Sequence, residues 1–246
     1  MIRYYYDLHI HSCLSPCADD DNTPNNIAGM AKICELNIAA LTDHNTCKNC
    51  PAFFKAAKRY GIIPIAGMEL TTAEDIHAVC LFETLEGALD FDAYVSSHRM
   101  LVPNRVEIFG DQLILDENDE VIGIEENYLH PASEVGIDAL PGVVAAYGGI
   151  AYPAHVDRES NGAIAVLGDF PDVGGFKNAE FYDGSKKAEY LSRYPALRSR
   201  RILVSSDAHN LWSVREENDS LTLDDEPYSS DKVRKEIFRI LKGETG

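Results

Sequence analysis

The chain has 246 residues, 45% hydrophobic and 25% charged, which is typical of a soluble folded protein and excludes a disordered, collagen-like or coiled-coil chain. Its 40 Asp and Glu residues outnumber its 22 Lys and Arg residues, and the net charge of −18 argues against duplex DNA or a membrane as a partner. No stretch reaches the roughly 18 apolar residues of a membrane-spanning helix, and no signal peptide is evident at the N-terminus, so we expect a cytoplasmic protein.

Short apolar runs alternate with amphipathic segments along the chain. Buried strands of a largely parallel sheet are predicted at residues 4–10, 38–42, 62–70, 76–82, 149–154, 178–182 and 202–206. The first helix is expected to begin after the N-cap Thr23 with Pro24, and the last to follow Ser230 and stop at Gly243. This alternation favours a β/α barrel or an open α/β sheet, as a single domain over residues 1–246.

Residues 104–128 interrupt this rhythm. Apolar and polar residues alternate on both sides of the acidic turn at residues 116–119, which predicts a β-hairpin inserted in the barrel. Such a hairpin could act as a lid or as an edge for self-association.

Six of the eight histidines stand at or next to the ends of predicted strands: His9, His11, His44, His77, His155 and His209. The carboxyl ends of parallel strands form one face, where barrel enzymes keep their chemistry. His9 and His11 are two residues apart on a strand, so their imidazoles lie on the same side and can chelate one cation. Asp207 and His209 repeat this spacing, and Glu69 ends another strand. Mixed imidazole and carboxylate ligands suit Zn, Mn or Fe.

The residues that carry this pattern also carry a family resemblance. The segments Asp7-Leu8-His9-Ile10-His11-Ser12, Thr42-Asp43-His44-Asn45, Gly67-Met68-Glu69, Pro153-Ala154-His155 and Ser206-Asp207-Ala208-His209 resemble the motifs of the PHP family, the polymerase and histidinol phosphatase superfamily of metal-dependent phosphoesterases. The resemblance extends from residue 7 to residue 209. It implies a distorted (β/α)7 TIM-like barrel that holds two or three divalent ions.

The resemblance also implies the ligands. His9, His11, Glu69 and Asp207 would hold the first ion; Glu69 would bridge to a second with His77 and His155; and His44 with His209 would hold a third. The family usually supplies one more ligand shortly after the His-x-His pair, and this sequence departs from its pattern there. Asp19 is the favoured residue for that place, with the Cys17 thiolate as the alternative. Asp43 is expected to support a ligand rather than to bind metal.

Ligands and resemblance together predict hydrolysis of a phosphate ester by a metal-bound hydroxide, with Glu69, Asp207 and His209 as the catalytic residues. The expected substrate is a small phosphorylated metabolite or nucleotide. The alternatives are an exonuclease acting on short single-stranded oligonucleotides, a histidinol-phosphatase-like enzyme and a non-catalytic metal-binding barrel.

Arg158 follows His155 by three residues, and its guanidinium is expected to bind the substrate phosphate, the alternative being a salt bridge to a surface acid. The pairs Cys13/Cys17 and Cys47/Cys50 could form a four-thiolate zinc site, although free thiols are the favoured interpretation. His98 and His130 match no motif and are expected to have surface or packing roles. The segment 180–185 is expected to shape the pocket floor without taking part in the chemistry.

Overall fold

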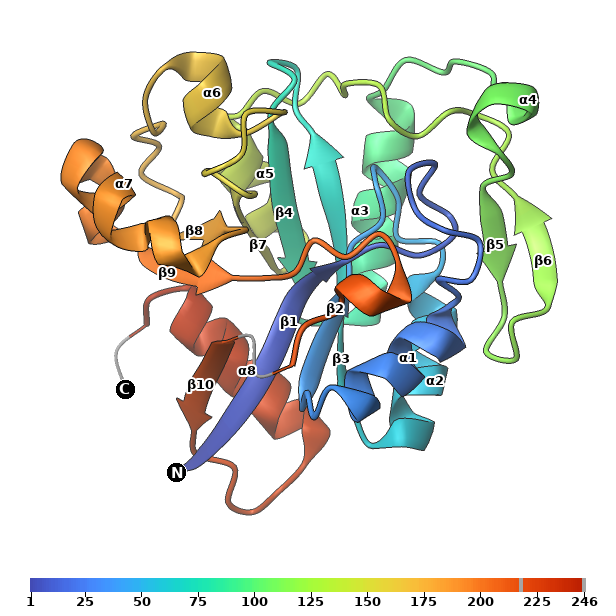
Figure 1. Cartoon of the computed structure of the whole chain (residues 1–246), viewed down its shortest axis with the longest axis horizontal. Helices are drawn as coiled ribbons and strands as arrows, with labels where there is room; N and C mark the ends of the chain where they lie inside the picture. Colours follow the sequence, from blue (N-terminus) through green and yellow to red (C-terminus); the bar gives the residue numbers. More distant parts are fainter. Residues whose placement is uncertain (217–218, 245–246) are drawn as a thin grey trace.

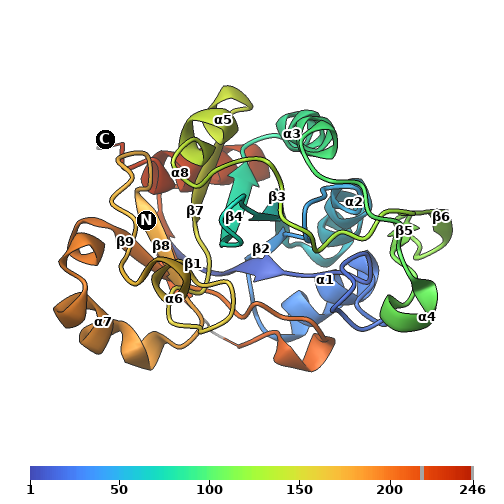
Figure 2. The same ribbon diagram turned by 90° about the horizontal axis from the view of Figure 1, so that it is seen from above.

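The computed structural model describes residues 1–216 and 219–244, and in this part of the chain seven strands form a distorted barrel (Figures 1 and 2). They are β1 (Ile2–Ile10), β2 (Ile38–Leu41), β3 (Ile63–Thr71), β4 (His77–Phe82), β7 (Gly149–Pro153), β8 (Asn178–Phe181) and β9 (Arg201–Val204). Strands β1, β2, β3, β4 and β7 are neighbours in one sheet, and the parallel pair β8–β9 completes the ring. Among the described residues, only short contacts connect this pair to the sheet on either side. Val156 after β7 donates a backbone hydrogen bond to Glu180 of β8, and Ile10 of β1 forms a β-bridge with Ala208 after β9. The predicted α/β barrel is therefore confirmed in a distorted form.

The sequence predicts a largely parallel sheet, and within the barrel this prediction is wrong for β4. β1, β2 and β3 are parallel to one another, whereas β4 is antiparallel to both β3 and β7. Consequently the first residue of β4, His77, lies at the same end of the barrel as the last residues of β1 and β3. A further strand, β10 (Asp219–Leu223), pairs antiparallel with β1 and was not foreseen from the sequence.

Helices cover the outside of the barrel and close its lower end. Helices α1 (Pro24–Ile33), α2 (Cys50–Tyr60), α3 (Leu85–Ser97) and α5 (Leu140–Ala146) lie around the strands in the view from above (Figure 2). Thr23 caps α1 as predicted, because its hydroxyl accepts a hydrogen bond from the backbone nitrogen of Asn26 at 3.2 Å. Helix α8 (Ser230–Leu241) lies beneath the barrel (Figure 1) and buries one apolar face. Short helices α6 (Ala163–Leu167) and α7 (Lys187–Arg193) flank β8 and β9.

Two apolar layers hold these elements together. One lies between the sheet and the outer helices and includes Phe53 of α2 and Phe91 of α3, both without exposed surface. The other joins Tyr6, Tyr152 and neighbouring strand residues to Phe238 of α8. The first layer includes Ile10 and Leu70 at the ends of β1 and β3, so the polar residues at the upper end rest on packed apolar side chains.

The segment predicted as an inserted hairpin contains helix α4 (Val106–Phe109) and the antiparallel strands β5 (Leu113–Leu115) and β6 (Val121–Ile124). Hydrogen bonds connect both β5 and the turn of this hairpin to the rest of the barrel. Asn49 at the start of α2 donates to the carbonyl of Leu113 and accepts from the amide of Leu115, and Asp119 accepts from the hydroxyl of Thr23 at 2.7 Å. The prediction of a hairpin is confirmed.

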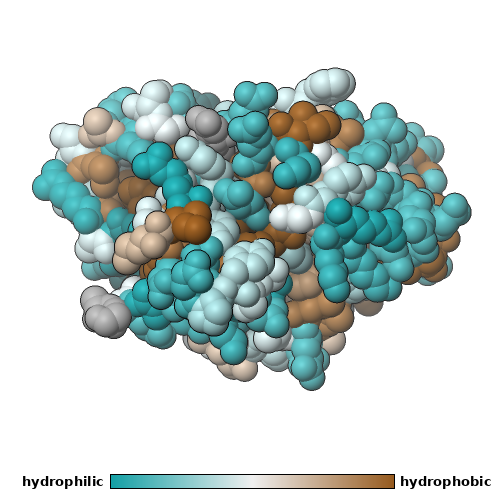
Figure 3. All heavy atoms as spheres, turned by 90° about the horizontal axis from the view of Figure 1, so that it is seen from below, coloured by the Kyte–Doolittle hydropathy of each residue, from teal (hydrophilic) through white to brown (hydrophobic). Residues whose placement is uncertain are grey.

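The molecular face seen from below carries mainly hydrophilic residues, with apolar residues in patches between them (Figure 3). Among the described residues, no helix combines the length and apolarity needed to cross a bilayer.

Candidate metal centre

The predicted ligands meet at the upper end of the barrel, around a cavity of about 180 Å³. β1 ends in a register shift between Asp7 and Ile10, the kind of irregularity that re-aims side chains next to functional sites. The cavity is lined by Cys17, His44, Glu69, His77, His130, His155, Arg158, Ser160, Asn161, Asp207 and His209.

Four side chains form a first group: His9, His11, Glu69 and Asp207. The two Nε2 atoms are 3.1 Å apart, each lies 3.2–3.3 Å from Glu69 Oε2, and each lies 3.3–3.4 Å from Asp207 Oδ1. A tetrahedral ion with bonds of about 2.0–2.1 Å needs ligand atoms about 3.3–3.4 Å apart. The spacing of these donor atoms therefore fits one divalent cation.

Glu69 extends this group because its two oxygens face different partners. Oε2 lies 3.2–3.3 Å from ring nitrogens of His9, His11 and His44, whereas Oε1 lies 3.0 Å from His77 Nδ1 and 3.0 Å from His155 Nε2. A carboxylate placed in this way can bridge two cations. The ligand atoms of His44, Glu69 and His77 lie close enough together to hold one ion, whereas the family resemblance implied His155 in place of His44.

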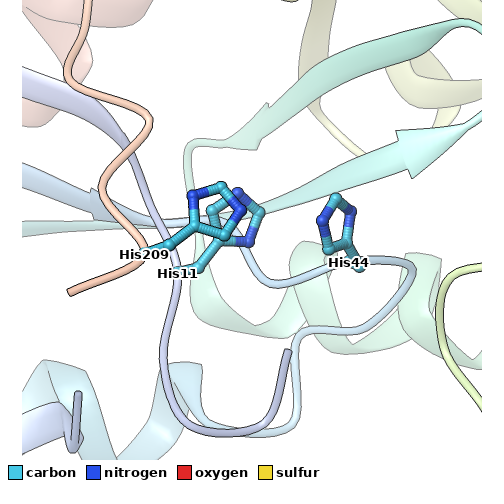
Figure 4. Close-up of side chains that lie close together, drawn as sticks. All are labelled: His11, His44 and His209. Atoms are coloured by element: carbon cyan, nitrogen blue, oxygen red, sulfur yellow. The ribbon is translucent and has the colours of Figure 1, made fainter. Parts of the chain in front are cut away.

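A third group contains His11, His44 and His209, which project from three separate segments (Figure 4). The His11 ring centroid lies 4.3 Å from that of His209 and 4.5 Å from that of His44. His209 Nδ1 donates to the carbonyl of Asp207 at 2.8 Å, which leaves Nε2 as its free ligand atom. The structure thus brings all eight His, Glu and Asp motif residues together.

Buried acceptors behind the imidazoles orient the rings. His9 Nδ1 donates to Glu180 Oε1 at 2.8 Å, and both side chains are buried. His11 Nδ1 lies 3.1 Å from the hydroxyl of Ser15, which donates to Asp43 Oδ1 at 2.7 Å. Such partners fix the ring tautomer and make the opposite nitrogen a better ligand. Asp43 therefore supports His11 through Ser15.

The backbone at the site is also unusual. Two candidate ligands, His155 and Asp207, have positive φ angles of 26° and 51°, and Asn45 next to His44 has one of 53°. Residues other than glycine rarely adopt this region, and such strain clusters at functional sites.

Charge and burial oppose each other in this site. Burial alone would raise the pKa of Glu69, but the surrounding imidazoles, led by those of His77 and His9, hold it well below its ordinary value. Burial alone would lower the pKa of His9, yet the carboxylates, led by Glu180 and Glu69, raise it well above the ordinary value. Burial also lowers the pKa of His44 well below normal. Ionised carboxylates among imidazoles, shielded from water, form a donor set suited to Zn, Mn or Fe.

Arg158 lies at the mouth of the cavity, where its Nη1 donates to Asp207 Oδ2 at 2.5 Å. Its guanidinium also stacks on Tyr182, with Cζ 3.9 Å from the ring centroid, and Arg215 Cζ lies 4.4 Å from the same centroid. Its acidic partner is thus a candidate metal ligand rather than a remote surface acid.

The two candidates for the additional ligand differ in position. Asp19 is exposed, is in none of the ligand groups found among the described residues and approaches the site only through its backbone nitrogen, 2.9 Å from the carbonyl oxygen of His209. Cys17 lines the cavity. All six cysteines are free, and no ligand group within the described residues contains one.

Two site residues were missed by sequence reasoning. Glu180 was assigned no chemistry, although an acidic residue inside a strand predicted as buried was a signal for it. His130 was expected to have a surface or packing role, but it lines the cavity, with its ring centroid 4.9 Å from that of His44. No local pattern marked it. His98 has the predicted packing role, because its ring stacks on Tyr94 at 4.0 Å.

A family model of the PHP domain matches residues 7–155. The chain belongs to the PHP domain family. No curated protein matches it significantly.

Solved structures share the fold at low sequence identity. The lesion-specific endonuclease Q of Pyrococcus furiosus is 18% identical with a TM-score of 0.67; the alignment covers 100% of this chain and 57% of that protein. A protein from Bifidobacterium adolescentis assigned as a metal-dependent phosphoesterase is 16% identical with a TM-score of 0.58, over 95% of this chain and 96% of that one. An endonuclease Q complex with a 27-mer duplex, which has an abasic lesion at the active site, is 18% identical with a TM-score of 0.62, over 100% of this chain and 58% of that protein. These likenesses confirm the barrel.

Proposed function

We propose that this chain is a metal-dependent hydrolase of phosphate esters that acts on a small phosphorylated metabolite or nucleotide. The single observation that carries the proposal is the arrangement of the two Glu69 oxygens, because Oε2 faces three imidazole nitrogens and Oε1 faces two others. A donor set with this division suits neighbouring cations, and clustered cations are typical of phosphoester hydrolysis. Membership of the PHP family supports the same reaction class.

The chain's own residues have distinct roles in this proposal. His9, His11, Glu69 and Asp207 would hold one ion, Glu69 with His77 and His155 a second, and His44 with His209 a third. When bound, such ions supply positive charge to the phosphoryl oxygens and the leaving group and lower the pKa of water. Asp207 and His209 then act at the reacting end of the site, next to the substrate.

Arg158 is proposed to bind the substrate phosphate. Its side chain is 37% exposed at the cavity mouth, and its guanidinium is already held between Asp207 and the ring of Tyr182. A guanidinium held in this way can donate two parallel hydrogen bonds to a phosphate, and the side chain loses little further conformational entropy on binding. It also adds positive potential in a chain whose net charge is −18.

A nuclease is the second candidate, because endonuclease Q has the same fold and one of its structures contains duplex DNA. The acidic composition alone therefore does not justify excluding duplex DNA as a partner. The histidinol-phosphatase-like and non-catalytic alternatives have no specific observation in their favour.

The test combines metal analysis with activity. Protein purified without chelators is expected to contain two or three transition-metal ions and, with added Mn²⁺, to release phosphate from small monoesters. Glu69→Ala should lose more than one ion and nearly all activity, whereas His77→Ala should lose chiefly one ion. Glu83→Ala is the control, because Glu83 pairs with Lys242 away from the site, and it should change neither metal content nor activity.

Fewer than one ion per chain, or full metal stoichiometry and activity in Glu69→Ala, would refute the proposal. A panel of monoesters, single-stranded oligonucleotides and duplexes with an abasic site distinguishes the phosphatase from the nuclease.

A further inference from the structure

Three aromatic rings form a row that leads away from the candidate metal centre, and we name this row the aromatic rim. It consists of Phe109, Tyr128 and His130. Tyr128 and His130 have near-parallel rings (16° apart) with centroids separated by 6.1 Å, and Phe109 stacks behind Tyr128 at 4.1 Å and 21°. His130 lies at the inner end, because its ring lines the cavity beside His44.

The aromatic rim is half-buried and rigidly held. The backbone nitrogen of Tyr128 donates to the carbonyl of Val102 at 2.7 Å, and Arg99 donates to the Tyr128 carbonyl at 3.2 Å. Asn45, beside His44, donates to the carbonyl of Leu129 at 2.6 Å. These bonds use the backbone, whereas the ring nitrogens of His130 and the hydroxyl of Tyr128 have no hydrogen-bond partner among the described residues. The rings are therefore fixed in place while their polar edges stay available to a ligand.

The size of the cavity shows why a substrate must reach this rim. A volume of about 180 Å³ is smaller than the ~300–1,000 Å³ of pockets that enclose a whole small ligand. It can hold a phosphoryl group and the atoms next to it. The remainder of the substrate must lie over the mouth, against the residues that surround it.

The two sides of the mouth differ in chemistry. On one side Tyr182 already stacks with Arg158 and Arg215, so this side offers positive charge rather than a free aromatic face. On the other side Tyr128 packs on Phe109, and the rings of the aromatic rim have no cation against them among the described residues. A ligand that spans the mouth therefore meets cations at one end and flat rings at the other.

We propose that the aromatic rim is a stacking subsite for a nucleobase, so that the phosphate ester hydrolysed by this chain is a nucleotide with an unpaired base. Stacking on aromatic side chains accepts any base, because every base has a π face. This inference rests on the proposed function for the position of the phosphate, and it adds the class of the group that carries the phosphate.

The experiment compares adenosine 5′-monophosphate with ribose 5-phosphate, which lacks the base, in the presence of Mn²⁺. Wild-type protein should have the higher kcat/KM for the nucleotide. Tyr128→Leu should reduce the ratio of the two kcat/KM values by about 5- to 150-fold, chiefly through KM, because one stacking surface is lost. Tyr128→Trp should keep the preference. Tyr228→Leu is the matched control, because Tyr228 is exposed beside α8 and away from the site, and it should leave the ratio unchanged.

A binding measurement separates this inference from the proposed function. Adenosine, which has no phosphate, should show saturation-transfer NMR signals with wild-type protein that are lost with Tyr128→Leu. This result without any phosphate release would support the subsite while refuting the hydrolase. The subsite is refuted if Tyr128→Leu keeps the wild-type kcat/KM ratio within twofold, or if wild-type protein binds no adenosine.

Discussion

Replacing Glu180 by alanine is expected to weaken metal binding at the site without removing any of the proposed ligands. Glu180 Oε1 accepts the hydrogen bond of His9 Nδ1 at 2.8 Å and lies 3.3 Å from the backbone nitrogen of His155. One carboxylate therefore orients both the imidazole ring of His9 and the backbone that carries His155. Its side chain is 1% exposed, so water cannot easily replace it.

The expected magnitude follows from that hydrogen bond. A hydrogen bond to a charged group contributes about 1.5–3 kcal/mol, which corresponds to about 10- to 150-fold in metal affinity. Glu180→Gln keeps an oxygen acceptor but loses the charge, so it should lose only about 3- to 10-fold. The order of metal affinity should be wild type, Glu180→Gln, Glu180→Ala.

Competition with a fluorescent chelator measures these affinities, and urea unfolding measures stability separately. Asp225→Ala is the matched control, because Asp225 is a buried carboxylate that accepts the hydroxyl of Tyr4 at 2.8 Å, far down β1 from the site. It should lower stability but not metal affinity. The reasoning fails if Glu180→Ala binds metal within twofold of wild type, or if Asp225→Ala loses as much affinity.

The remaining predictions concern the ligand left open, the substrate phosphate and acid stability. If the Asp19 carboxylate completes the site, Asp19→Asn should abolish activity and Cys17→Ser should have little effect; the opposite ranking, with sensitivity to thiol reagents, would assign the place to Cys17. Arg158→Ala should lower kcat/KM by about 10- to 150-fold at unchanged metal content, with partial recovery in Arg158→Lys; kinetics within twofold of wild type would show that Arg158 does not bind the phosphate. Burial raises the pKa of Glu125, but the hydrogen bond from Lys48 and the charges around it outweigh this effect and lower the pKa. Its contribution to stability is therefore full above its ordinary pKa of about 4.3 and is lost as the pH falls below that value. Glu125→Gln should lower the free energy of unfolding by about 1–3 kcal/mol at pH 7 and much less at pH 3, measured by urea unfolding; equal losses at both pH values would contradict this.

Much of the site could be predicted from the sequence, because its residues lie in short motifs tied to strand ends. His9 and His11 share a face as a consequence of the two-residue period of a strand, whatever surrounds them. Thr23 and Pro24 likewise determine the start of α1 by local hydrogen bonding and a fixed φ angle. Such features depend only on residues close to one another in the sequence, so the local sequence pattern is enough to predict them.

Other features depended on contacts between distant segments. His77 reaches the site only because β4 runs against β3 and β7, and no residue near His77 records that direction. Glu180 and His9 are 171 residues apart in sequence yet 2.8 Å apart in space. His130 enters the cavity because Asn45, from another loop, holds the adjoining backbone.

The sequence by itself therefore determined which chemistry is present: the metal-binding residue types, their pairing along strands and the alternation that builds an α/β barrel. Only the tertiary structure decided how Glu69 divides its oxygens between two groups of imidazoles and which side chains stand behind and beside the ligands. The physical reason is the distance along the chain over which each kind of interaction acts. Side-chain period and capping act over a few residues, whereas the direction of a strand and the approach of two loops are set by burial and hydrogen bonding across the whole barrel.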